Sequence, residues 1–131
     1  MIPALNRDGD CLSDLVLPML GSIAGAESVL LAFDPDHEVT VAMAEAPHGT
    51  APALRGQDLA NPLAMILACG ALLRRAADRH GSAFERASRA VYEGALETIA
   101  AGIKTPDLGG HAGSTEFTAA VIERMRTRPA V

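Results

Sequence analysis

A stretch crowded with glycine and proline constrains the fold of this chain more than any other feature. It runs from His48 to Pro62. β-Branched and apolar residues dominate Glu38–Ala44 before it, and a long apolar segment follows it. This concentration of glycine and proline predicts a loop held between a strand and the N-terminus of a helix. The backbone N–H groups of such loops point outward and suit nucleotides and phosphates, although a plain surface turn has the same composition.

The composition describes one domain, residues 1–131, with an aliphatic core. A chain of 131 residues buries around two-thirds of its unfolded surface, which is enough for a core. Apolar residues make up 49% of the chain, yet only Tyr92 and three phenylalanines are aromatic. Because aliphatic side chains pack helix against helix closely, we expect a helix-dominated fold.

Charge and cysteine usage exclude several classes of partner. The formal charge is −5 and no basic stripe is present, which argues against nucleic acids and anionic membranes. The longest apolar run, residues 62–73, is too short to span a bilayer. Cys11 and Cys69 lie far apart in periodic segments, which is typical of reduced thiols, and the start has no signal-peptide pattern. These features predict a cytoplasmic protein.

Two strands are expected in the first half of the chain. Ser28–Phe33 and Glu38–Met43 have strand composition, and residues 34–37 between them have turn chemistry. A β-hairpin is therefore predicted. A turn is predicted at Gly21–Gly25.

About four helices are expected to pack with this hairpin, giving an α/β fold. Each begins at a capping residue, and the last is followed by a frayed tail, Thr127–Val131. The predicted helices start at Ser13, at Asn61, at the capping box Ser82–Glu85 and at Ser114, and end near Leu20, Asp78, Ala101 and Arg126.

Three blocks in one order resemble the isocitrate/isopropylmalate dehydrogenase family. Asn6–Asp14 resembles its N-x-x-G-D-x-x-S-D signature. Glu45–Pro52, with Gly56 and Asn61-Pro62, resembles its E-x-x-H-G-[ST]-A-P…G…N-P cofactor loop. Thr105–Gly110 with Thr115–Thr118 resembles its closing T-x-D-L-G-G…E-F-T segment. The resemblance implies the fold of the C-terminal part of such an enzyme.

Asp10 and Asp14 are the candidate metal ligands. On a helix, a spacing of four residues places both carboxylates on one face, where they repel each other unless a cation intervenes. Oxygen ligands suit Mg²⁺ or Mn²⁺. The alternative is that both acids only favour a helix N-terminus through its dipole. The resemblance implies metal ligands, completed in the family by an Asp from the partner subunit that has no counterpart here.

The resemblance also implies a nucleotide site in the loop. His48, Gly49, Thr50 and Ala51 match the segment that wraps the adenosine of NAD(P), and Asn61 matches the residue that hydrogen-bonds adenine. A solvated loop histidine is the alternative for His48.

Two further positions decide how well that loop would bind. NAD-dependent members usually carry Asp after the H-G-[ST]-A-P segment, and NADP-dependent members carry Lys-Tyr. This chain has Ala53-Leu54 instead. Weak binding, with a preference for NAD or another adenine nucleotide, is therefore expected.

Glu45 and Asp107 are weaker candidates for a functional role than the residues above. Glu45 matches a family glutamate beside the nicotinamide, and a strand-end carboxylate facing water is an equal alternative. Asp107 is expected to tether its own loop by local hydrogen bonds. No catalytic residue is assigned, because the family's substrate-binding arginines and its proton-shuttling Tyr and Lys lie in a first half that is absent here.

Three roles follow from these features. The chain is part of a split enzyme, whose separate partner chain supplies the N-terminal half and with which it oxidises and decarboxylates a 2-hydroxy acid. Alternatively it is a non-catalytic nucleotide-binding or regulatory module that self-associates through the helix Ser13–Leu20. A remnant that merely folds is the third role. Catalysis by the isolated chain is not expected, because proton-transfer groups and carboxylate clamps account for much of the rate.

Overall fold

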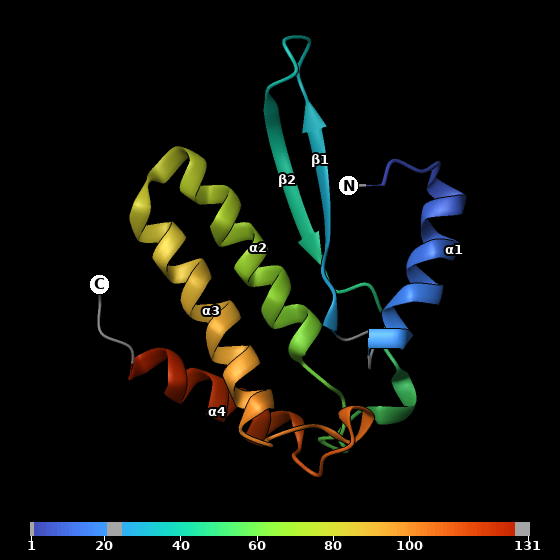
Figure 1. Cartoon of the computed structure of the whole chain (residues 1–131), viewed down its shortest axis with the longest axis vertical. Helices are drawn as coiled ribbons and strands as arrows, with labels where there is room; N and C mark the ends of the chain where they lie inside the picture. Colours follow the sequence, from blue (N-terminus) through green and yellow to red (C-terminus); the bar gives the residue numbers. More distant parts are fainter. Residues whose placement is uncertain (1, 21–24, 128–131) are drawn as a thin grey trace.

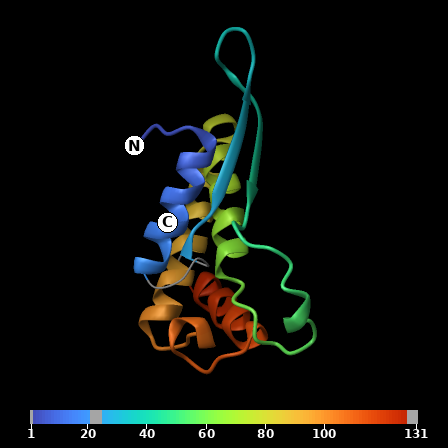
Figure 2. The ribbon, with the colours of Figure 1, turned by 90° about the vertical axis from the view of Figure 1, so that its right-hand side faces the viewer.

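The computed structural model of the protein describes residues 2–20 and 25–127 (Figure 1). The predicted turn at 21–25 and the predicted tail therefore lie largely outside the described residues. Three long helices form one body, and a β-hairpin and an N-terminal helix stand against or beside it (Figures 1 and 2). The expected helix-dominated fold with a short hairpin is confirmed. The elements are α1 (Asn6–Val16), η1 (Leu17–Leu20), β1 (Ser28–Phe33), β2 (Val39–Glu45), η3 (Pro52–Leu54), α2 (Leu63–His80), α3 (Ser82–Ala100), η4 (Pro106–Leu108) and α4 (Ser114–Arg126).

The core lies where α2, α3 and α4 meet. Its buried side chains are aliphatic apart from Phe117, which is completely inaccessible to solvent. Fully burying a side chain of this size contributes about 1.5–3 kcal/mol, so the C-terminal helix is held mainly by its apolar face. The cluster comprises Leu63, Leu67, Ala95, Phe117 and Val121.

Gly70 lets α2 and α3 approach each other closely. A Cβ at this position would lie 2.9 Å from Cε2 of Tyr92, closer than real Cβ atoms come. The buried Ser88 hydroxyl donates to the Gly70 carbonyl at 2.8 Å, which fixes the crossing further. The pair turns back at Gly81, whose φ of +87° suits glycine.

The predicted end of α3 is confirmed at Gly102. This residue has φ +87°, and its N–H donates to the Ile99 carbonyl at 3.0 Å, while Ile103 N–H donates to Thr98 at 3.2 Å. The two bonds form a Schellman motif, which glycine permits because it has no Cβ.

The hairpin is antiparallel, as predicted, although its second strand begins and ends slightly later than expected. Ser28 pairs with Glu45 at one end and Phe33 pairs with Val39 at the other, with an irregularity after Ala32. The carboxylate of Asp34 accepts N–H bonds from Asp36 (3.0 Å) and Glu38 (2.9 Å), which explains the tight turn.

One face of the hairpin covers α2, and the other face stays open. The hairpin extends beyond the helical body in Figure 1. Leu30, Val41 and Met43 on its outer face are 50%, 60% and 50% exposed. A two-stranded hairpin alone is marginally stable in water, so its contact with α2 holds it in place.

The prediction that Ser13 caps the first helix is wrong. The helix α1 begins at Asn6, and the Ser13 hydroxyl donates back to the carbonyls of Gly9 (2.9 Å) and Asp10 (3.0 Å). Gly9 is tolerated inside the helix, so the start lies about two turns earlier than its serine suggested. Pro18 then accounts for the change to a 3₁₀ turn, because proline has no N–H to donate to the carbonyl four residues before it and so ends the α-helical hydrogen-bond pattern.

The capping box at Ser82–Glu85 does not form either. The carbonyl of Gly81 accepts the Phe84 N–H at 3.1 Å, so Ser82 already lies inside the first turn of α3. Its hydroxyl accepts a bond from Arg86 at 3.1 Å, and Glu85 faces Arg74 of α2 at 3.6 Å. The tight turn between the two helices takes the place of a side-chain cap.

Tyr92 joins α3 to the residue before β1, and its titration should report on that contact. Its hydroxyl donates to Glu27 at 2.8 Å. Burial, followed by the hydrogen bond to Glu27 and the negative charge of Glu27, raises the pKa of Tyr92 to about 12 from the ordinary value of 10.0. Neutral Tyr92 therefore stabilises the fold below pH 10, and this contribution is lost as the pH rises from about 10 through about 12.

The chain has a single tyrosine, so near-ultraviolet absorbance measures this titration directly. We expect a midpoint well above 10 in the folded protein. Glu27→Gln should move it toward the ordinary value, because the negative charge is removed. Equal midpoints in the native and urea-unfolded chain would contradict the assignment.

Candidate functional site

The glycine- and proline-rich loop leaves β2, passes through η3 and returns to the start of α2, as Figure 2 shows on its right-hand side. Ala51 has a φ of +40°, and its carbonyl accepts the Leu54 N–H at 2.9 Å. Gln57 then donates from its backbone to Leu54 (3.1 Å) and from its side chain to Ala53 (2.6 Å). Consecutive turns therefore make residues 51–57 one hydrogen-bonded unit.

Asp58 fastens this unit to the N-terminus of α4. One carboxylate oxygen accepts both the backbone N–H and the hydroxyl of Thr115, each at 2.8 Å. The Asp58 carbonyl accepts the Ser114 N–H at 3.0 Å. The first N–H groups of a helix have no partner within the helix, and a carboxylate there also gains from the helix dipole. An aspartate 57 positions earlier in the chain thus caps this helix.

The prediction that Ser114 caps α4 is therefore wrong. Its hydroxyl instead donates to the carbonyl of Ala60, which gives the loop a second attachment. Gly113 precedes the helix, and a Cβ there would collide with the Asp58 carboxylate. Glycine is required at this position because the loop occupies the space that a side chain would fill.

Asn61 provides the third attachment. Its side-chain oxygen accepts the Leu63 N–H at 2.9 Å, and its amide nitrogen donates to Asp107 at 2.9 Å. The cap predicted for Asn61 thus exists as a hydrogen bond, although the helix is assigned from Leu63. Asp107 also accepts the Thr105 hydroxyl at 2.6 Å, so the predicted local tether is confirmed.

The other predicted nucleotide-binding residues lie in the part of the loop before these attachments. His48, Gly49 and Thr50 are exposed, and His48 Nδ1 lies 3.0 Å from the Gly49 carbonyl. A Cβ at Gly49 would meet open space. The loop therefore presents a polar, accessible backbone before Ala51 and is fastened only after it.

Asn61 keeps capacity for a ligand despite its two internal bonds. An amide side chain offers two N–H donors and two acceptor lone pairs, and contacts with the described residues use one of each. One donor and one acceptor remain, which is the complement that the edge of an adenine ring requires. The residue is half-buried at the start of α2.

Asp10 and Asp14 both lie on α1, four residues apart and exposed. The spacing places the carboxylates along one side of the helix, as predicted. They can supply two oxygen ligands of the six or more that Mg²⁺ or Ca²⁺ takes. Within residues 2–20 and 25–127, no group of three or more His, Cys, Asp or Glu side chains is placed to hold a metal ion.

The other residues that the sequence singles out, Glu45 and the two cysteines, lie at the surface. Glu45 ends β2 and is exposed, and both cysteines are free and exposed. Asp58 was not identified from the sequence as part of the site. Because Gly113 has no side chain, α4 needs an acceptor from elsewhere in the chain, but nothing in the sequence identifies Asp58 as that acceptor.

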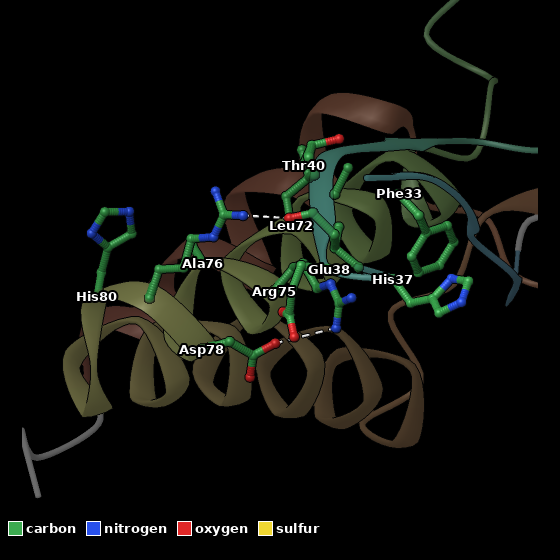
Figure 3. Close-up of a pocket in the computed structure, with 12 residues that line it drawn as sticks. Phe33, His37, Glu38, Thr40, Leu72, Arg75, Ala76, Asp78 and His80 are labelled. Atoms are coloured by element: carbon green, nitrogen blue, oxygen red, sulfur yellow. Dashed lines mark hydrogen bonds and ion pairs between the residues drawn. The ribbon is translucent and has the colours of Figure 1, made fainter. Parts of the chain in front are cut away.

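A groove of about 650 Å³ lies elsewhere, between the hairpin and the end of α2 (Figure 3). Phe33 and His37 line it from the hairpin, and Arg75 and His80 line it from the helix. Its charges are largely satisfied internally, since Arg75 pairs with Asp78 at 3.2 Å and Arg79 donates to the Val39 carbonyl. None of the predicted site residues lines this groove.

Comparison with known proteins identifies the family of the chain. The family model described as isocitrate/isopropylmalate dehydrogenase matches residues 2–124. The chain belongs to this family. No helix in the described part of the chain has the length and apolarity needed to cross a membrane.

Individual members of the isocitrate/isopropylmalate dehydrogenase family are similar over most of the chain. The 3-isopropylmalate dehydrogenase of Novosphingobium aromaticivorans is 37% identical over 120 residues, covering 92% of this chain and 33% of the relative. Subunit 2 of the mitochondrial NAD isocitrate dehydrogenase of Kluyveromyces lactis is 39% identical over 122 residues, covering 92% of this chain and 30% of the relative. The chain thus spans about a third of the length of these relatives.

A solved structure has the same fold. The apo β-decarboxylating dehydrogenase of Thermococcus kodakarensis aligns with a TM-score of 0.67 at 30% identity. The alignment covers 92% of this chain and 32% of that one. The chain therefore has the fold of about a third of that dehydrogenase.

The Asn61 attachment predicts a measurable loss of stability. Asn61→Ala removes the acceptor for Leu63 and the donor to Asp107, so the free energy of unfolding should fall by about 1–2 kcal/mol. Urea denaturation measures the change. Gln57→Ala, which removes one exposed bond within the loop, should cost less than half as much, and equal losses would contradict the assignment.

Proposed function

We propose that the chain is part of, or derived from, an NAD(P)- and Mg-dependent dehydrogenase that oxidises and decarboxylates a 2-hydroxy acid of the isocitrate or 3-isopropylmalate type. The observation that carries this proposal is the family match over residues 2–124, together with an accessible loop fastened at Asp58, Ala60 and Asn61. As a lone chain it is incomplete. The remaining two-thirds of the relatives' length would come from another segment or a separate chain.

In this proposal, the residues of the chain bind and orient rather than transfer protons. Residues 48–51 would present backbone groups to the adenosine part of the cofactor, and the free donor and acceptor of Asn61 would meet the adenine. Asp10 and Asp14 would give two carboxylate ligands to a divalent cation. When bound, NAD(P)⁺ supplies the hydride acceptor, and Mg²⁺ supplies Lewis-acid stabilisation of the keto oxygen during loss of CO₂.

The cofactor preference follows from η3. Ala53 and Leu54 occupy this turn and are exposed, so neither a carboxylate for the ribose hydroxyls nor a cation for a 2′-phosphate is offered there. We propose weak binding of NAD⁺ or another adenine nucleotide. The two exposed free thiols support a reducing compartment such as the cytoplasm.

Restoring the missing carboxylate tests the nucleotide site. Ala53→Asp should tighten NAD⁺ binding about tenfold, because a hydrogen bond to a charged group contributes about 1.5–3 kcal/mol. Isothermal calorimetry of the purified chain measures the affinity. NADP⁺ serves as the internal control, since its 2′-phosphate would be repelled by the new charge. No heat from NAD⁺, NADP⁺ or Mg²⁺ at millimolar concentration, with or without Ala53→Asp, would refute the binding roles.

The second candidate function is a non-catalytic module that self-associates through α1 and η1. One observation favours it: α1 has no buried residue, and Leu15 and Met19 are 70% and 79% exposed. Leu12 and Val16 add further apolar surface to the same short segment. Contiguous exposed apolar side chains of this kind mark interaction surfaces.

Sedimentation velocity tests that association. The wild-type chain should sediment as a dimer or larger species at micromolar concentration, and Leu15→Asp should shift it toward the monomer. Met65→Asp is the matched control, because Met65 is a 57% exposed apolar residue on α2. A monomeric wild type, or an equal effect of both variants, would exclude this surface.

A further inference from the structure

Asp58 is neither a candidate metal ligand nor a candidate nucleotide-binding residue, yet it binds the first turn of α4. It lies at φ +56°, a left-handed conformation that is uncommon for residues other than glycine, asparagine and aspartate. The carboxylate and the carbonyl of this residue both bond to the first turn of α4, so its side chain and its backbone act together. Such a conformation is retained when surrounding contacts compensate for its cost.

Asp58 lies between two ordered parts of the molecule, the turns of the loop before it and the helix α4 that it binds. Toward the N-terminus, the chain of turns through Gln57, Leu54 and Ala51 reaches the exposed nucleotide-binding segment. Toward the C-terminus, Phe117 and Val121 fix α4 in the core. The loop is therefore joined to the buried core through the first turn of a helix, and Asp58 makes three of the four hydrogen bonds at that junction, Ser114 to Ala60 being the other.

Gly113 shows that the junction has two complementary sides. A Cβ there would collide with the Asp58 carboxylate and lie 2.9 Å from the Asp58 carbonyl oxygen. The aspartate and the glycine thus form one steric and hydrogen-bonded fit. Neither residue is among those expected to contact the cofactor.

We propose that Asp58 is a positioning residue for the nucleotide-binding loop, which it holds in its binding conformation by capping α4. This inference rests on the proposed nucleotide-binding function. It adds that order in residues 51–57, which form the hydrogen-bonded base of the exposed residues 48–50, and docking of the first turn of α4 are a single equilibrium. A ligand that binds the ordered loop should then also protect the start of α4, because thermodynamic coupling between two sites is reciprocal.

Hydrogen exchange of the full chain, measured by mass spectrometry, tests the coupling together with NAD⁺ titration. Asp58→Ala should increase exchange in residues 46–60 and 114–118 and weaken NAD⁺ binding about tenfold. Asp58→Gly separates the two causes, because glycine keeps the left-handed backbone and removes only the carboxylate. Asp58→Gly should show the same increase in hydrogen exchange and the same loss of NAD⁺ affinity as Asp58→Ala, with a smaller decrease in the free energy of unfolding.

Two more variants complete the design. Asp58→Asn tolerates the backbone conformation and retains an acceptor oxygen, so exchange should stay close to wild type and NAD⁺ affinity within about threefold. Asp34→Ala is the matched control, since Asp34 also accepts two N–H bonds but in the distant hairpin turn. It should leave the loop, α4 and NAD⁺ affinity unchanged.

The outcomes separate this inference from the function on which it rests. If wild type binds NAD⁺ and Asp58→Gly binds it equally well, the positioning role is overturned while the nucleotide site stands. If wild type binds no NAD⁺, the proposed function fails, and exchange alone decides whether Asp58 orders the loop. Unchanged exchange in both Asp58→Ala and Asp58→Gly would overturn the junction itself.

Discussion

The candidate site depends on the N–H groups at the start of α4, which have no acceptor within the helix and need one from elsewhere in the chain. Every helix N-terminus leaves donors without partners inside the helix, and a helix packed into a core must satisfy them locally. Here Gly113 offers no side chain, so the acceptor comes from Asp58 in another part of the chain. Satisfying the helix and fastening the loop are consequently the same interaction.

This arrangement divides the loop into two parts with different properties. Residues after Ala51 are held by successive turns and by three attachments to the segment 105–115. Residues 48–50 are exposed and carry only a local contact. A nucleotide site needs both properties, because an accessible backbone approaches phosphate or sugar, and a rigid base limits the entropy lost on binding.

Outside the three-helix core, α1 and the hairpin expose apolar side chains. The helix α1 buries none of its residues, and the outer face of the hairpin exposes leucine, valine and methionine. The solved relative is about three times as long, and the chain aligns with 32% of it. In the described residues the three-helix core is closed, whereas the hairpin and α1 leave apolar side chains open to solvent.

The sequence by itself determined the family, the hairpin, the three long helices and the place of the loop between strand and helix. These depend on local chemistry: Asp34 makes its turn with neighbours two and four residues away, and Gly102 ends α3 through its own φ. The cap predicted at Ser114 was wrong for the complementary reason, because its hydroxyl bonds to the carbonyl of Ala60, 54 positions away, which a serine near a helix start does not reveal. The caps predicted at Ser13 and Ser82 were wrong for a local reason, since both hydroxyls bond to residues three or four positions away inside helices that begin earlier than predicted or at a tight turn. Only the folded chain could decide that Asp58 meets Thr115 and that Asn61 meets Asp107, because those pairs are separated by 57 and 46 positions and are brought together by the packing of the helices.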